Sequence, residues 1–261
     1  MLGIFIPEIK KHILDGFGGN RFGFSIWLFQ FVFISLLVID KENNFFKCLL
    51  YVAPIIFLQN LSGGRTGLFA SIIFMLLFFW GDKKRFIWTI FYLIGISILG
   101  FYYAKFAGFD DLETVVRVTP EIGGSYFYVD SPTLSYLDRF LSYRLSIMAS
   151  AFSNFDIYSA IFGLGVNQFH GYMLGSPQEV HNVFLRTLGE LGVFGLLIFL
   201  AILLHPFFIF IKDSKIRLIK IFMFVYLIIG CFHSEILLTA ISTCMVFWFC
   251  YAEILFKSRT I

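Results

Sequence analysis

The chain has 261 residues, of which 59% are hydrophobic and only 14% are charged, and its mean hydropathy is +0.84. Ordinary soluble domains carry about 25% charged residues, so this composition excludes a soluble protein and predicts an integral membrane protein. The 37 Phe residues favour hydrocarbon as strongly as Leu or Ile does, which indicates helical spans rather than alternating barrel strands. The net charge of +3 is uninformative by itself.

Crossing a hydrocarbon core of about 30 Å takes roughly 17–25 apolar residues in a helix. Several segments meet or approach this length, and the three shorter ones are expected to extend into flanking polar residues. The predicted spans are Phe24–Ile39, Phe45–Leu61, Gly67–Trp80, Phe86–Ala104, Glu190–Ile211, Ile216–Phe232 and Thr239–Phe256. We therefore predict an all-α polytopic membrane protein with about seven transmembrane helices, forming a single membrane domain over residues 1–261.

Lys and Arg gather in alternate connections, which are predicted to be cytoplasmic because short cytoplasmic loops are enriched in these residues. The connections are Lys41–Lys47, Lys83–Arg85, Lys212–Lys220 and Lys257–Arg259. The same alternation of cytoplasmic and external connections places residues 105–188 outside the cytoplasm, as a long loop between the fourth and fifth spans. It also places the N-terminus outside, so we expect further spans upstream of this chain.

Arg65 lies in SGGRTG, Ser62–Gly67, directly before the predicted span Gly67–Trp80. A helix N-terminus there would favour an anion through its free N–H groups and dipole. The guanidinium adds a planar donor fork that matches phosphate oxygens. The alternative is an interfacial Arg that reaches lipid headgroups.

Arg144 belongs to LDRFLSYRLSIMASAFS, Leu137–Ser153, which has the periodicity of an amphipathic helix. Helical geometry places Arg144 in the middle of the apolar stripe. A charge there requires an anionic partner or an aqueous cavity. That partner is either an anionic substrate or a structural carboxylate, for which the candidates are Asp138, Asp156 and Glu190.

The stretch HNVFLRTLGELGVFGLLIFLAILL, His181–Leu204, runs from a polar turn into a bilayer-length apolar segment without a predicted break. Its periodicity puts His181 on one helical face while Glu190 points away. The same face carries Leu185, Leu188, Gly192 and Gly195. The two glycines are expected to let another backbone approach closely.

An imidazole side chain ordinarily titrates near neutrality, and His181 is predicted to lie at the outer rim of a span. It could accept a proton from an attacking hydroxyl, or it could be an ordinary buried imidazole. Asn182 could orient His181, bind a sugar hydroxyl or cap the helix. The role of Arg186 stays undecided at this point.

Signals for metals and cofactors are weak. Asp110, Asp111 and Glu113 could hold a divalent cation, although adjacent acidic residues in a loop are usually solvated. GLGVN, Gly163–Asn167, contains G-x-G without the strand and third glycine of a dinucleotide site. The cysteines lie in apolar runs without metal-ligand spacing: Cys48, Cys231, Cys244 and Cys250. We expect neither a metal nor an organic cofactor.

Four motifs together resemble the O-antigen ligase and O-antigen polymerase superfamily of bacterial inner-membrane proteins. The most specific is HNVFL followed by ELGVFG, with Glu190–Gly195 leading into a long span. The others are SGGRTG before a span, GFGGNRFGFS at Gly16–Ser25, and YRLSIMASAFSNFDIYSAIFGLGVNQF at Tyr143–Phe169. Their shared order and spacing carry the resemblance.

The resemblance implies a fold similar to the membrane glycosyltransferases of the GT-C type, and transfer of a glycan from undecaprenyl diphosphate to a hydroxyl acceptor on the periplasmic side. It implies that Arg65 and Arg144 bind the diphosphate and that His181 acts as base. Asn182, Arg21 and Arg186 would support substrate binding. The implied partners are the lipid-linked donor, a glycan or lipid A core acceptor, membrane lipids and a chain-length regulator, with no nucleic acid.

Three functions remain distinguishable in principle. A polymerase joins lipid-linked repeat units, whereas a ligase hands finished chains to lipid A core or to a protein. A flippase would move the same lipid-linked glycan across the membrane, but transporters place polar groups near mid-membrane. The charges here lie at the predicted outer rim, which argues against a transporter. Polymerisation is the preferred prediction, with ligation as the alternative.

Overall fold

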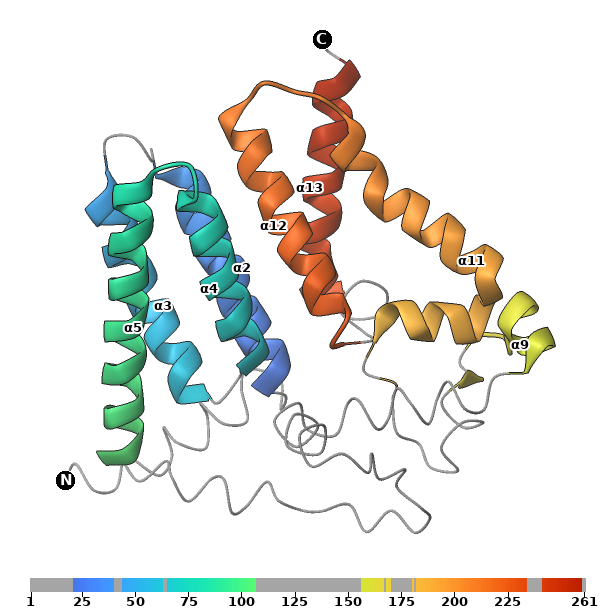
Figure 1. The fold of residues 1–261 in the computed structure, drawn as a ribbon, viewed down its shortest axis with the longest axis horizontal. Helices are drawn as coiled ribbons and strands as arrows, with labels where there is room; N and C mark the ends of the chain where they lie inside the picture. The colour runs from blue at the N-terminus through green and yellow to red at the C-terminus, as the bar shows by residue number, and fades with distance from the viewer. Residues whose placement is uncertain are drawn as a thin grey trace. The chain divides into compact units, whose positions relative to one another are not determined.

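In the computed structural model, residues 21–39, 44–62, 65–106, 156–166, 168–169, 180, 182–233 and 241–259 are described, and their regular structure is entirely helical (Figure 1). The long helices are α2 (Arg21–Val38), α3 (Phe45–Ser62), α4 (Arg65–Phe79), α5 (Lys83–Phe106), α11 (Val183–Phe208), α12 (Ser214–Gly230) and α13 (Ile241–Arg259). A short helix, α9, covers Ile157–Phe162. Each predicted span coincides with one long helix to within about a turn, except that α11 begins well before Glu190.

Contacts divide the chain into two compact units. The first comprises Met1–Val118 with Lys212–Tyr226, and the second comprises Thr119–Ile211 with Leu227–Ile261. The first unit therefore holds α2 to α5 and most of α12, while the second holds α9, α11 and α13.

In the first unit, α2 packs on α3 and α4, and α5 covers α3 and α4. An aromatic cluster holds α2, α4 and α12 together. The rings of Phe33 and Phe222 are stacked, with 4.1 Å between their centroids. The rings of Phe29 and Phe74 meet edge to face, with 5.8 Å between their centroids. Phe29, Phe74 and Phe222 are fully buried. Large aromatic rings therefore form this core. In a membrane, helices associate through van der Waals packing rather than through the hydrophobic effect, and such rings supply large packing contacts.

One buried polar contact crosses this core. The Gln30 side-chain amide on α2 donates to the Tyr226 hydroxyl on α12 at 2.8 Å. Both side chains are buried. A hydrogen bond between two buried groups fixes the register of the two helices, because sliding either one would leave buried polar atoms unsatisfied.

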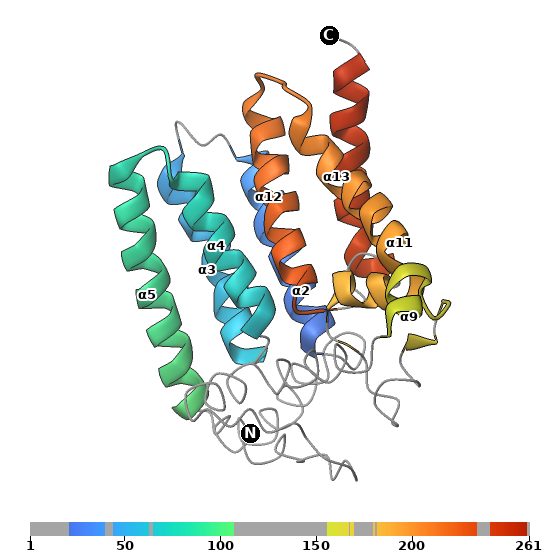
Figure 2. The same cartoon turned by 45° about the vertical axis from the view of Figure 1, so that its right-hand side comes forward.

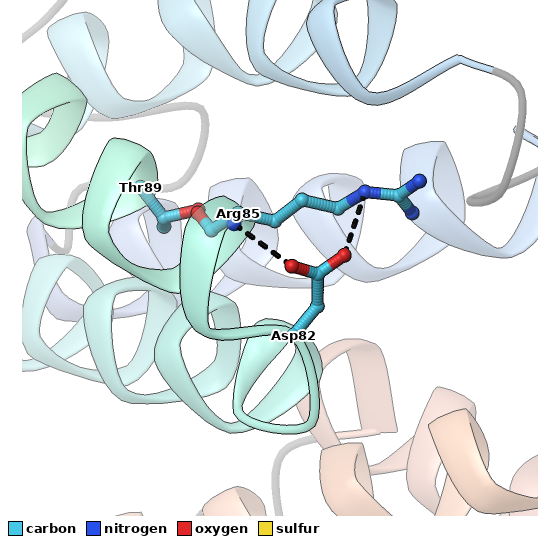
Figure 3. Close-up of polar contacts among 3 residues, drawn as sticks. All are labelled: Asp82, Arg85 and Thr89. Atoms are coloured by element: carbon cyan, nitrogen blue, oxygen red, sulfur yellow. Dashed lines mark hydrogen bonds and ion pairs between the residues drawn. The ribbon is translucent and has the colours of Figure 1, made fainter.

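The turn between α4 and α5 is closed by its own side chains (Figure 3). One Asp82 carboxylate oxygen accepts from the Arg85 backbone N–H at 3.1 Å, and the other pairs with Arg85 Nε at 3.0 Å. The Thr89 hydroxyl donates to the Arg85 carbonyl at 2.8 Å. Asp82 thus caps the N-terminus of α5, within a connection that also carries Lys83 and Lys84.

Much of the helical surface is apolar and exposed. On α5, the exposed large side chains include Phe91, Ile94, Ile98, Leu99 and Tyr102. Among the described helices, Val183–Phe208 is long and apolar enough to cross a membrane, and Gly23–Val38, Phe45–Leu61 and Thr66–Phe79 are shorter apolar helices. That all seven long helices cross the bilayer stays a prediction.

Candidate functional site

Two predicted site residues begin neighbouring helices of the first unit. A Cβ atom on Gly67 of α4 would overlap the Ser25 carbonyl of α2, so the two backbones touch near their first turns. Phe29 and Phe74 meet further along, so α2 and α4 run in the same direction. The first residues of these helices are Arg21 and Arg65.

Two helix N-termini therefore lie side by side at one end of the first unit. Their free N–H groups and dipoles both favour an anion at that end. The end of α3 lies there as well, because the Gln59 side-chain amide donates to the Ser25 carbonyl at 3.1 Å. The sequence predicted a helix N-terminus at Gly67, just after Arg65, and the observed helix begins two residues earlier, at Arg65. The adjacent start of α2 follows only from the packing.

In the second unit, Asn182 caps the N-terminus of α11. Its side-chain oxygen accepts from the backbone N–H groups of Phe184 at 3.0 Å and Leu185 at 2.9 Å. Capping, one of the interpretations that the sequence left open, is therefore present in the structure. His181 precedes this cap directly in the chain, and both His181 and Arg144 lie outside the described residues.

The helix that follows the cap is broken at Gly192. This residue has φ 69° and ψ −174°, far from helical values, so α11 consists of two helices joined at a bend (Figure 1). The expectation of an unbroken helix from His181 onward is therefore wrong, as is that of one continuous face reaching Gly192 and Gly195. We call Val183–Leu191 the half-helix, and Val193–Phe208 the apolar half of α11.

The Gly163–Gly165 turn occupies the break. The N–H of Leu164 donates to the Gly189 carbonyl at 2.8 Å, and the N–H of Gly165 donates to the Glu190 carbonyl at 3.0 Å. In an unbroken helix those carbonyls would accept from residues 193 and 194. The turn therefore supplies the donors that the break removes, and satisfies backbone groups that would otherwise be buried without partners.

We call this contact between the Gly163–Gly165 turn and Gly192 the glycine joint. G-x-G carried no predicted function beyond its part in the resemblance, and its structural role depends on a partner distant in the sequence. The close backbone approach expected at Gly192 does occur, because a Cβ atom there would overlap the Ile161 carbonyl.

Arg186 and Glu190 form a buried ion pair on the half-helix. The distance from Arg186 Nε to a Glu190 carboxylate oxygen is 2.9 Å, and the two side chains are only 6% and 8% exposed. Glu190 was one of three carboxylates considered as a partner for Arg144. Its observed partner is Arg186.

A small apolar core supports the half-helix from the loop side. Phe169, Val180 and Leu185 are buried together, and Leu164 and Leu188 pack against them. The Phe169 ring lies so close to Gly189 that a Cβ atom there would overlap it. The half-helix is thus held by its cap, the glycine joint, the ion pair and this core, all in the second unit.

These helices, with their exposed apolar surfaces and a span-length α11, define a helical membrane protein. The family model for O-antigen ligase matches residues 50–200, more than half of the chain, so the chain belongs to the O-antigen ligase family. It is accordingly a membrane enzyme of the glycosyl-transfer type, as the resemblance predicted. No curated protein and no solved structure matches the chain.

Proposed function

We propose that this enzyme transfers an oligosaccharide from undecaprenyl diphosphate to a sugar hydroxyl on the periplasmic side of the inner membrane, and so polymerises glycan repeat units. The observation that carries the proposal is the pair of helix N-termini at Arg21 and Arg65, within a chain of the O-antigen ligase family. Two positive helix ends and two guanidinium-bearing residues suit a diphosphate, which carries several negative charges.

In the proposed reaction, the acceptor oxygen forms a bond to the anomeric carbon of the donor sugar. The bond from that carbon to the diphosphate oxygen breaks, and undecaprenyl diphosphate leaves with the bonding electrons. His181 takes the proton of the acceptor hydroxyl. Arg65 and Arg144 stabilise the charge that grows on the leaving group. Because the diphosphate is already a good leaving group, the proposal requires no metal ion.

The capped half-helix supports the role of His181. Asn182 Oδ1 fixes the first turn of α11 directly after His181, and the ion pair and glycine joint fix the same short helix further along. A base must be held within hydrogen-bond reach of the proton it removes. In this proposal Asn182 and Arg186 support the substrate site by holding the half-helix, and Arg21 adds to the diphosphate side.

Ligation is the second candidate, because the family whose model matches the chain is described as O-antigen ligase. Polymerase and ligase share the same donor and the same leaving group, and differ only in the acceptor. The donor-side residues therefore serve both functions, and lipid A core or a protein would replace the growing glycan as acceptor.

Gel analysis of the surface glycan in a strain lacking this gene distinguishes the functions. A polymerase defect leaves acceptors capped with a single repeat unit, and complementation restores the ladder of longer chains. Loss of all capped acceptors would instead indicate a ligase. Accumulation of donor on the cytoplasmic side would indicate transport, and would overturn the proposed transfer reaction.

A further inference from the structure

The short helix α9 leaves large apolar side chains uncovered. Ile157, Tyr158 and Phe162 are 70%, 73% and 73% exposed, and Val166, just beyond the helix, is 65% exposed. At about 100° per residue, the three helical side chains fall within an arc of roughly 140° around α9, and the buried Ser159 lies outside that arc. We call Ile157, Tyr158, Phe162 and Val166 the α9 face.

The α9 face lies next to exposed apolar side chains of α11. Helix α9 packs against α11 beside its bend (Figure 1, Figure 2), and Gly163, directly after Phe162, touches Gly192. Directly beyond Gly192, the side chains of Phe194 and Leu197 are 63% and 57% exposed on the helix that is long and apolar enough to cross a membrane. Two exposed apolar surfaces therefore start at the same joint.

The length of the apolar half of α11 places this joint near the edge of the hydrocarbon region. Val193–Phe208 has about 16 residues, which rise roughly 24 Å at about 1.5 Å per residue. The hydrocarbon core is about 30 Å thick. With Phe208 at the far boundary, a segment of this length ends roughly 6 Å short of the near boundary, so the glycine joint lies just inside the edge of the hydrocarbon region.

The opposite end of α9 carries a charge. The Asp156 carboxylate accepts from the backbone N–H of Ser159 at 2.6 Å and from its hydroxyl at 2.7 Å. These hydrogen bonds lower the pKa of Asp156, so the group is ionised at neutral pH. Because an ionised carboxylate is costly in hydrocarbon, this end of α9 must stay on the water side, while the exposed apolar side chains can face lipid.

We propose that the α9 face inserts into the lipid at the membrane interface and anchors the glycine joint at a fixed depth. The partner is the bilayer itself, in the region where acyl chains meet headgroups. This role goes beyond glycan transfer and does not depend on which acceptor the enzyme uses. Because the half-helix is tied to the same joint, the anchor also fixes the height of Asn182 relative to the lipid.

Depth measurements with spin labels on the full-length chain test the anchor. Single cysteines at Tyr158, Phe162 and Val166 are placed in a chain whose four native cysteines are changed to Ala, and the labelled protein is reconstituted in nanodiscs of phosphatidylethanolamine and phosphatidylglycerol. Collision rates are measured with oxygen, which concentrates in lipid, and with a water-soluble nickel complex. Phe194→Cys is the lipid-exposed control, and Gln168→Cys, on an exposed residue beyond the turn, is the water-exposed control.

The expected result is that labels on the α9 face favour oxygen collisions as the Phe194 label does, while the Gln168 label favours the nickel complex. Nickel accessibility equal to that of Gln168 would overturn the anchor. Labels shielded from both reagents would also overturn it, since they would show that protein covers the face. Because three positions are labelled, the test still gives a result if one variant fails to fold. The measurement does not require glycan transfer, so its failure is separate from failure of the proposed function.

Discussion

Gly163 and Gly192 lie backbone to backbone, and neither has room for a side chain. A Cβ atom on Gly163 would lie 2.6 Å from the Gly192 nitrogen, and one on Gly192 would lie 2.8 Å from the Gly163 nitrogen. Gly163 has φ 76° and ψ 170°, and Gly192 has φ 69° and ψ −174°, a region of backbone space that essentially only glycine occupies. The pair therefore fixes how the turn after α9 meets the break in α11.

Replacing Gly192 by Ala should destabilise the protein. The backbone conformation alone costs about 1–3 kcal/mol with a side chain present, and the overlap with the Ile161 carbonyl adds to it. Thermal unfolding in detergent, followed by size-exclusion chromatography, measures the effect. Gly95→Ala is the matched control, because a Cβ atom on Gly95 meets nothing within 4 Å. Equal unfolding temperatures for the two variants would contradict the role of the joint.

The effects of substitutions at Arg186 and Glu190 on stability should depend on each other. Arg186→Met or Glu190→Leu alone leaves a buried charge without its partner, which typically costs about 3–5 kcal/mol. The double variant should recover most of the lost stability, because apolar side chains of similar volume often replace a buried ion pair without loss. Thermal unfolding of the single and double variants forms the test, and additive losses would contradict the coupling.

The same double variant separates two roles of Arg186. If the ion pair only holds the half-helix, glycan polymerisation should recover together with stability. If Arg186 also contacts the substrate, stability should recover while glycan chains stay short. Membrane protein level and surface glycan, measured in the same cells, distinguish these results.

Asn182→Asp should retain the cap, since Asp and Asn cap helices about equally well. Asn182→Ala should lose the two hydrogen bonds from Phe184 and Leu185 and cost about 1 kcal/mol. Glycan polymerisation by both variants is measured at matched membrane protein level. Full activity of Asn182→Asp would assign Asn182 to the cap, whereas its inactivity would favour direct contact with a sugar hydroxyl.

Substitutions at the proposed catalytic residues should abolish long glycan chains while the protein still reaches the membrane. We expect this for Arg65→Ala, Arg144→Ala and His181→Ala in a strain lacking the chromosomal copy. Arg65→Lys should also be poor, because an ammonium group cannot make the bidentate contact with phosphate. A glycan ladder of wild-type length from His181→Ala would remove His181 as the base.

Arg21→Ala tests whether the charged side chain at the start of α2 contributes to the proposed diphosphate site. Because the N-termini of both α2 and α4 remain, the expected effect is a higher KM for the lipid-linked donor with a smaller change in kcat. A Gly23→Ala variant is the control in the same turn, since a Cβ atom there meets nothing within 4 Å. An unchanged donor KM in Arg21→Ala would show that the Arg21 side chain does not contribute to binding of the diphosphate.

The sequence predicted the long helices because each is a local property: an apolar run must hydrogen-bond its own backbone in lipid, and it does so as a helix. The predicted limits Phe45–Leu61 and the observed α3, Phe45–Ser62, nearly coincide for this reason. The predicted span Gly67–Trp80 likewise differs from the observed α4, Arg65–Phe79, by two residues at its start and one at its end. The roles of Arg144 and His181 stay predictions, because these residues lie outside the described part of the chain.

By itself, then, the sequence determined the membrane class, the helix positions and the family resemblance, since composition, periodicity and local motifs carry that information. Only the tertiary structure decided that α11 breaks at Gly192, that Glu190 pairs with Arg186, and that α2 begins beside α4. Each of these depends on contacts between residues distant in the chain or on a backbone angle. Glycine permits such an angle without requiring it, so the sequence alone could not specify the break.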